Sequence, residues 1–166
     1  MLTRRFNFFE LAAVMLVVAV MVYAIFSRTM RYLEIAEKAA MTITVLEVER
    51  GMRVRFAMAA MKAAPAPPAN WQEINPFEFA RAVPPNYLGE LGGQADLQEL
   101  KPGNWFYDKD RHEIAYLPRL ASRYRSEADT APPIIRFRAG KGGGTSSLPS
   151  LIPVAPYQWE PEFGTF

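Results

Sequence analysis

The stretch FNFFELAAVMLVVAVMVYAIF, residues 6–26, decides the fold because it is apolar enough to cross a membrane. Residues 11–26 carry no charge, and the phenylalanines before them bring the segment close to the roughly 20 residues that span a bilayer. A cleaved secretory signal would be followed by a cleavage site of small residues, but this segment continues in good helix formers. The sequence therefore predicts a membrane-spanning helix over residues 6–27.

Glu10 is the unusual residue of this segment, because a carboxylate at the centre of a bilayer costs about 2.5–3.5 kcal/mol. Two interpretations are open. Glu10 could lie in headgroup water beside Arg4 and Arg5, or it could have a partner and a role in assembly. Arg4 and Arg5 also fit the cytoplasmic flank of a membrane span. Arg28 and Arg31 on the other side make that charge bias small.

The helical pattern continues beyond the apolar run. Apolar residues recur at spacings of three and four, as on one face of an amphipathic helix: Tyr32, Ile35, Ala36, Ala39, Ile43, Leu46, Val54, Ala57 and Met61. Charged residues lie on other faces: Glu34, Glu37, Lys38 and Glu49. A strand over TITVLEV, 42–48, is the alternative, and Gly51 weakens a helix by about 1 kcal/mol. Because the apolar spacing keeps its phase across both features, we expect one helix over residues 6–62, about 85 Å long.

The second part of the chain, residues 63–166, is predicted to be a small globular head with loops rich in proline and glycine. The run AAPAPPAN, 63–70, ends the helix because consecutive prolines remove backbone donors and disfavour helical geometry before them. Residues 71–83 are expected to hold a short helix. The segment PPNYLGELGG, 84–93, has the composition of turns.

Three short strands are predicted in the head, at residues 104–107, 112–117 and 134–138, because runs of apolar and aromatic residues alternate there with turn-forming segments. We expect them to pair as an antiparallel sheet against the helix, burying Trp105, Ile114, Tyr116 and either Ile135 or Phe137. The proline-rich residues 151–163 fit an edge strand or a cover over the core. The predicted fold class is α+β, with a long N-terminal helix packed on a small antiparallel sheet.

Composition excludes several classes of function. The chain has no cysteine, so disulfides and thiolate metal sites are excluded and the head must hold by packing alone. The formal net charge of +2 is too small to indicate a nucleic-acid partner. His112 is the only histidine, and no motif places a nucleophile beside it. The sequence therefore predicts a protein that is not an enzyme.

Two groups of head residues bear on ligand binding. Asp108, Asp110 and Glu113 offer oxygen atoms to calcium, but they lack the glycine and the ligand count of a calcium loop. We therefore favour a solvated hairpin turn there and predict no cofactor. The tryptophans could stack on sugars or bases. A head of this size without disulfides needs large apolar residues, so we favour a core role, at least for Trp105.

The segment RRFNFFELAAV, 4–14, combines a basic leader, aromatic residues, a glutamate and an apolar helix. It resembles the N-terminus of type IV pilins and of the pseudopilins of type II secretion. The resemblance implies that a prepilin peptidase cuts the leader, residues 1–5, before Phe6 and that the new amine is methylated. It also implies that Glu10 neutralises the amine of a neighbouring subunit, which would make Glu10 a determinant of axial register in a filament.

The resemblance extends into the head, where NPFEFARAVPPNYLGE, GNWFYDKDRHEIAYLP and IIRFRA are similar to segments of minor pilins and of the mannose-sensitive haemagglutinin group. Three features depart from the family: Arg5 where glycine precedes the cut, Ser27 where many members have proline, and the missing C-terminal disulfide. Because Arg5 is bulky and charged, we expect cleavage to be inefficient or absent. A guanidinium of Arg4 or Arg5 from a neighbouring subunit would then meet Glu10.

The function that this resemblance implies is a structural one. The chain would be a minor pilin or pseudopilin of a type IV pilus-like or secretion-related filament, assembled through its N-terminal helix. Before assembly it would reside in the bacterial inner membrane with a periplasmic head. Its partners would be copies of itself, related pilins and an inner-membrane assembly platform. The alternative is a single-pass, membrane-anchored periplasmic binding or sensor protein that does not polymerise. An anchored enzyme lacks a recognisable catalytic cluster in the sequence.

Overall fold

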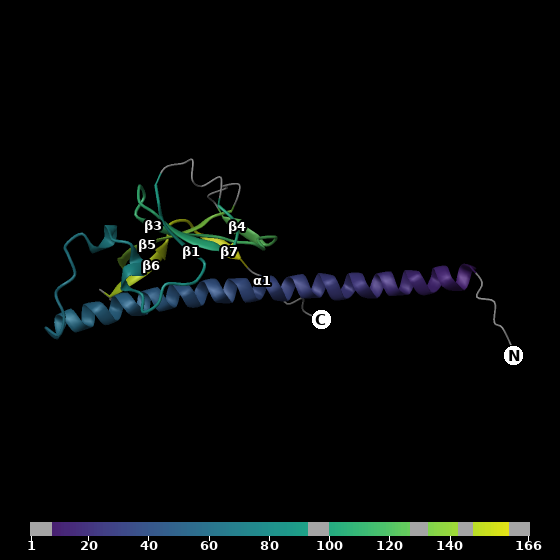
Figure 1. Cartoon of the computed structure of the whole chain (residues 1–166), viewed down its shortest axis with the longest axis horizontal. Coiled ribbons are helices and arrows are strands. Elements are labelled where there is room, and N and C mark those ends of the chain that lie inside the picture. Colours follow the sequence, from purple (N-terminus) through teal and green to yellow (C-terminus); the bar gives the residue numbers. More distant parts are fainter. Residues whose placement is uncertain (1–7, 93–99, 127–132, 143–147, 160–166) are drawn as a thin grey trace.

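One long helix organises the molecule, as described by a computed structural model that covers residues 8–92, 100–126, 133–142 and 148–159. This helix, α1 (Phe8–Ala60), carries the head on one side of its C-terminal half, while its N-terminal half extends beyond the head (Figure 1). At about 1.5 Å per residue, α1 is roughly 80 Å long. Residues 8–26 are exposed throughout.

The predicted continuity of the helix is confirmed over the described residues. Residues 42–48 are helical, so the strand alternative is wrong for that segment. The helix ends where Lys62 adopts a left-handed backbone with φ of 54° and the Ala63 N–H donates to the Met58 carbonyl at 2.8 Å. This is the pattern of a Schellman C-cap, and the proline run that follows prevents the helix from continuing.

The described residues of the head form a five-stranded sheet in the order β1-β2-β3-β5-β6. Its strands are β1 (Tyr87–Leu91), β2 (Asn104–Asp108), β3 (Glu113–Leu117), β5 (Ile135–Lys141) and β6 (Pro149–Pro153). Two short strands, β4 (Tyr124–Ser126) and β7 (Tyr157–Trp159), pair with each other. Neighbouring strands are antiparallel except β1 and β2, which are parallel. The sheet is therefore mixed.

The three predicted strands are confirmed, and their antiparallel pairing places Trp105 opposite Tyr116. The prediction of an entirely antiparallel sheet is wrong, because residues 87–91, which have the composition of a turn, form β1 beside β2. Gly89, with φ of +99°, interrupts the register of this strand. A five-residue strand with a glycine bulge carries little alternation for a sequence pattern to detect. The edge position of β6 agrees with the edge strand that the proline-rich tail predicts.

The predicted short helix at 71–83 is replaced by two 3-10 turns, η1 (Trp71–Glu73) and η2 (Pro76–Phe79). Pro76 has no N–H to donate, and the Asn75 side chain accepts a hydrogen bond from the Phe77 N–H at 3.1 Å. A new turn therefore begins at Asn75 and interrupts any longer helix.

The core lies between α1 and the sheet. All the residues predicted to be buried are buried, including both Ile135 and Phe137. The core role of Trp105 is confirmed, since it is 1% exposed and its ring centroid lies 4.8 Å from that of Tyr116. Trp159 is equally buried. Aromatic packing thus supplies the cohesion that disulfides would give in a chain with cysteines.

The face of α1 that carries the head differs from the apolar face that the sequence pattern marks. The residues of α1 buried against the head are Glu34, Met41, Val48, Glu49 and Met52. An amphipathic helix usually turns its apolar stripe toward the core. Here most of the large residues of that stripe are exposed, from Val54 at 51% to Met61 at 71%, and Ile35 is half-buried. The glutamates expected to lie away from the packed face are part of it instead.

Candidate assembly surface and docking carboxylates

Helix α1 is long and apolar enough, by length and composition, to cross a membrane. Its most apolar part lies near the N-terminus, and none of it is buried within the chain. Glu10 lies in the first turn of α1 and is exposed. Arg4, Arg5 and Phe6 lie outside the described residues, so the pairing of Glu10 with a cation or an amine stays a prediction.

An apolar stripe continues along α1 beyond the membrane-length segment, on the side away from the head. We call it the outer stripe, and its large residues are Tyr32, Ile43, Leu46, Val54 and Met61. Successive residues of an α-helix are about 100° apart, so Ile43 lies about 200° around the axis from the buried Met41. Every large residue of the outer stripe is at least half exposed. More than half of the surface of Ile43, Leu46 and Met61 is therefore open to water.

Three carboxylates of α1, which we call the docking carboxylates, hold the head on the opposite face: Glu34, Glu37 and Glu49. Glu34 is 3% exposed and accepts hydrogen bonds from three donors of the head: Ser122 Oγ at 2.7 Å, the Arg123 N–H at 3.1 Å and Trp159 Nε1 at 3.0 Å. Burial raises the pKa of Glu34, but these hydrogen bonds outweigh it and leave the pKa below its ordinary value. The ionised form is thus the one that docks the head.

Glu37 receives the loop that follows β3. Its Oε1 accepts from the Arg119 N–H at 2.6 Å and from the Tyr116 hydroxyl at 2.8 Å, and its Oε2 accepts from the Leu120 N–H at 2.9 Å. Burial, and then the hydrogen bond to Glu37, raise the pKa of Tyr116. The loop after β3 therefore has its backbone donors satisfied by the helix.

Glu49 fixes β6 in the same way. It accepts hydrogen bonds from the Ser150 hydroxyl and from the Leu151 N–H, the latter at 2.8 Å. Arg53, one turn further along α1, pairs with the other oxygen of Glu49 at 3.2 Å and donates to the Pro149 carbonyl. Together with the first two docking carboxylates, Glu49 fastens the head along about 15 residues of α1.

Two of the three docking carboxylates, Glu34 and Glu37, could have been found by a second spacing in the sequence, and Glu49 lies beside that row. Residues 34, 37, 41, 45, 48 and 52 follow one another at intervals of three and four, which places them on one helix face. Met41, Val45 and Val48 give this face an apolar centre. A carboxylate on such a face resembles a solvent-facing residue until the backbone donors opposite it are known.

The calcium candidates of the β2–β3 hairpin are placed among arginines. Asp108 and Glu113 are buried rather than solvated, and Arg136 donates to both, at 2.8 Å and 3.5 Å. Arg138 donates to Glu113 at 2.6 Å. Asp110 is exposed. Among the described residues, no group of three or more His, Cys, Asp or Glu side chains is placed to hold a metal ion.

His112, the only histidine, lies in the hairpin turn and is exposed. Its backbone is left-handed, with φ of 54°, and its Nδ1 lies 3.3 Å from the Tyr107 hydroxyl. The neighbouring Tyr107 hydroxyl donates to the Glu73 carbonyl. These contacts tie the hairpin to the 3-10 turn η1, which is a structural role.

Comparisons with protein-family models, with curated proteins and with solved structures find no match to this chain.

Proposed function

We propose that this chain is a membrane-anchored structural subunit, without catalytic activity, that assembles with like chains through α1 into a filament of the type IV pilus or type II secretion kind. The observation that carries the proposal is the outer stripe. It extends the apolar side of α1 well past the segment that a membrane would cover, and it points away from the described residues of the head.

The driving force for assembly would come from the part of α1 outside the membrane. Packing the membrane segments of two chains exchanges lipid contacts for protein contacts, so little hydrophobic free energy is gained there. The outer stripe, by contrast, lies in water before assembly. Burying it removes apolar area from water at roughly 25 cal/mol per Å². Helices packed side by side along this stripe would therefore be stabilised mainly beside the heads.

Glu10 would set the stagger between neighbouring helices. A carboxylate and a cation that are both buried among apolar helices stabilise one another only at the register that brings them together. The cation would be the amine at Phe6 if the leader is removed, or a guanidinium of Arg4 or Arg5 if it stays. The assembly platform of the bacterial inner membrane is the partner that this role requires, and a prepilin peptidase would join it if the leader is removed.

Cysteine cross-linking tests the proposal directly, because the chain has no cysteine and each variant therefore carries a single thiol. With a bifunctional maleimide reagent that is long enough to span the stagger between neighbouring helices, Ile43→Cys and Leu46→Cys on the outer stripe are expected to give covalent dimers in intact membranes. Thr42→Cys is the matched control, since Thr42 is exposed on the same turn but lies off the stripe. Equal cross-linking at all three positions, or none, would favour the non-polymerising anchored protein. Electron microscopy of sheared filaments would then identify the product of assembly.

A further inference from the structure

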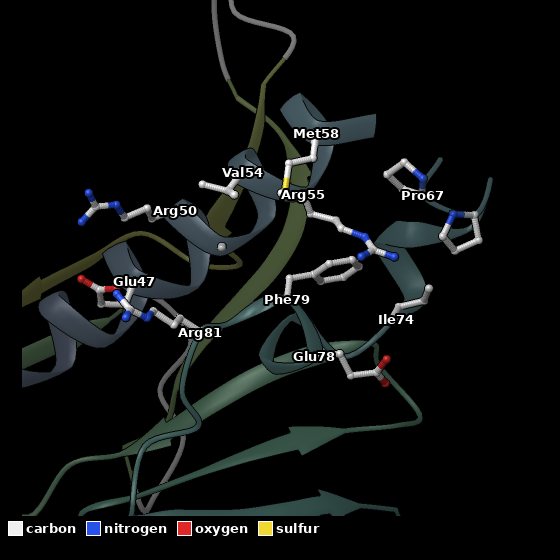
Figure 2. Close-up of a pocket in the computed structure, with 12 residues that line it drawn as sticks. Glu47, Arg50, Val54, Arg55, Met58, Pro67, Ile74, Glu78, Phe79 and Arg81 are labelled. Carbon is white, nitrogen blue, oxygen red and sulfur yellow. The ribbon is translucent and has the colours of Figure 1, made fainter. Parts of the chain in front are cut away.

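A groove of about 750 Å³ lies between the C-terminal part of α1 and the segment that leads from the proline run to residue 81 (Figure 2). Its volume falls within the range of about 300–1,000 Å³ that is typical of ligand sites. Neither the docking carboxylates nor the core residues line it. The groove shares Val54 with the outer stripe and is otherwise a separate feature of the chain.

The groove is built by a close contact between helix and loop. Gly51 lies against the backbone of Phe79 and Ala80, and a Cβ at residue 51 would collide with the Phe79 carbonyl oxygen. Pro67 and Pro68 stiffen the opposite wall. Since both walls are fixed by backbone geometry, the groove is preformed and a ligand would not have to order it.

The lining combines an apolar floor with three arginines. Val54, Met58, Ile74 and Phe79 supply the apolar side chains, and Val54 and Met58 are about half exposed. Figure 2 shows the Arg55 guanidinium reaching across the groove toward Phe79 and Ile74.

Arg50 and Arg81 line the groove together with Arg55, and Glu47 and Glu78 stand beside them. In the described part of the chain, none of the three arginines forms an ion pair with a carboxylate. Three arginines and two glutamates give the lining a formal charge of +1. This charge complements a ligand with one or two carboxylates but not a polyanion, which the two glutamates would repel.

Position on the rod excludes a lipid as the occupant if residues 8–26 cross a membrane. Arg55 lies 29 residues beyond Phe26 in α1, or about 44 Å along the helix axis at about 1.5 Å per residue. No bilayer headgroup reaches that far. The occupant must come from solution, on the side of the membrane where the head resides.

We propose that this groove binds a short acidic peptide segment of a partner protein, with a carboxylate on Arg55 and a neighbouring apolar side chain on the floor formed by Val54, Met58 and Phe79. Guanidinium groups recognise carboxylates through paired, directional hydrogen bonds, and the apolar floor selects peptides that also carry an aliphatic or aromatic residue. The inference does not rest on filament assembly, because a single chain contains the whole groove.

The test uses the full chain as a monomer in detergent micelles and two fluorescein-labelled hexapeptides, Gly-Glu-Phe-Glu-Leu-Gly and Gly-Gln-Phe-Gln-Leu-Gly. Fluorescence anisotropy is expected to give saturable binding of the acidic peptide and at least about tenfold weaker binding of the glutamine peptide. Arg55→Gln is expected to weaken the acidic peptide by at least about tenfold, and Met58→Glu to abolish its binding. The matched control is Arg31→Gln, an exposed arginine of α1 outside the groove, which should bind like the unchanged chain.

Several results would overturn the proposal. Equal binding of both peptides would mean that the arginines do not read a carboxylate. Unchanged binding by Arg55→Gln would place the peptide elsewhere, and displacement by millimolar inorganic phosphate would indicate a general anion site. Absence of saturable binding up to about 1 mM, an affinity of only about 4 kcal/mol, would also refute it. If Met58→Glu alters self-association of the chain instead, the groove belongs to a contact between copies.

Discussion

Removal of the Glu34 carboxylate is predicted to loosen the head from α1. In Glu34→Leu three donors lose their acceptor: the Ser122 hydroxyl, the Arg123 N–H and the Trp159 indole N–H. Trp159 is 1% exposed, so its N–H is left buried without a partner, which costs about 1–3 kcal/mol. The lost charge-assisted hydrogen bonds add a similar amount, offset in part because a buried charge no longer has to be desolvated. We expect the free energy of unfolding to fall by about 3 kcal/mol.

Glu34→Gln separates the role of charge from that of hydrogen bonding. The amide oxygen keeps the bonds from Arg123 and Trp159, and the amide N–H can donate to the Ser122 hydroxyl, which is free to rotate. Only the charge assistance is lost, so we expect a loss of about 1 kcal/mol at neutral pH. Because the pKa of Glu34 lies below its ordinary value, its stabilisation is present above that ordinary value and is lost as the pH falls through the folded pKa. Glu34→Gln should remove this acid-side loss.

Thermal unfolding of the full chain in detergent micelles, followed by tryptophan fluorescence and near-UV circular dichroism, measures both variants. A loss of about 3 kcal/mol corresponds to a decrease in Tm of about 10–20 °C for a domain of this size. The control is Glu47→Leu, an exposed glutamate of the same helix, whose Tm should hardly change. If Glu34→Leu unfolds at the same temperature as Glu47→Leu, the docking carboxylates do not hold the head.

Three further perturbations are predicted. Gly51→Ala should lower the free energy of unfolding by about 1–2 kcal/mol because the new methyl group meets the Phe79 carbonyl, although helix propensity alone would raise it by about 1 kcal/mol. A higher midpoint in chemical denaturation would contradict the close contact. Burial and nearby carboxylates raise the pKa of Tyr107 to about 12. Its contribution to stability is therefore complete below pH 10 and is lost between about pH 10 and 12, and Tyr107→Phe should lack that loss in alkaline denaturation. Glu10→Leu should leave the protein inserted and folded but reduce its incorporation into filaments, measured against the unchanged subunit in sheared material; equal incorporation would speak for an anchored protein that does not polymerise.

The parts of this fold that could be predicted have local signals. The helix across residues 42–48 is predicted by the spacing of apolar residues, which keeps its period through a β-branched run. This prediction requires no knowledge of tertiary contacts. The hairpin of β2 and β3 is likewise encoded by two aromatic-rich runs around a short polar turn. By contrast, β1 has five residues, one of them Gly89, and it pairs in parallel with β2. Nothing within residues 87–91 distinguishes that strand from a turn.

The orientation of α1 could not be predicted because the helix carries two stripes, not one. Met41 and Ile43 lie about 200° apart around the helix axis, and each belongs to a row of apolar residues at spacings of three and four. The row of Met41 includes glutamates, which a hydropathy pattern assigns to solvent. In the folded chain Glu37 of this row and Glu49 beside it accept hydrogen bonds from backbone N–H groups of the head at residues 119, 120 and 151. The head docks on the row of Met41 because the carboxylates there accept those N–H groups, which the aliphatic side chains of the other row cannot do.

The hydrogen bonds between the head and these glutamates explain why the more apolar row remains exposed. A head docked on the row of Ile43 would bury apolar area, but the backbone N–H groups of residues 119, 120 and 151 would then face aliphatic side chains. Each unsatisfied group would cost about 1–3 kcal/mol. Packing of the head against the docking carboxylates avoids that cost and leaves the outer stripe in water. An exposed apolar row of that length is unfavourable for a solitary soluble chain and is a feature of interaction surfaces. The same choice of face that provides acceptors for the head thus leaves α1 with an apolar row in water, and this row is the surface on which the proposed contact between chains depends.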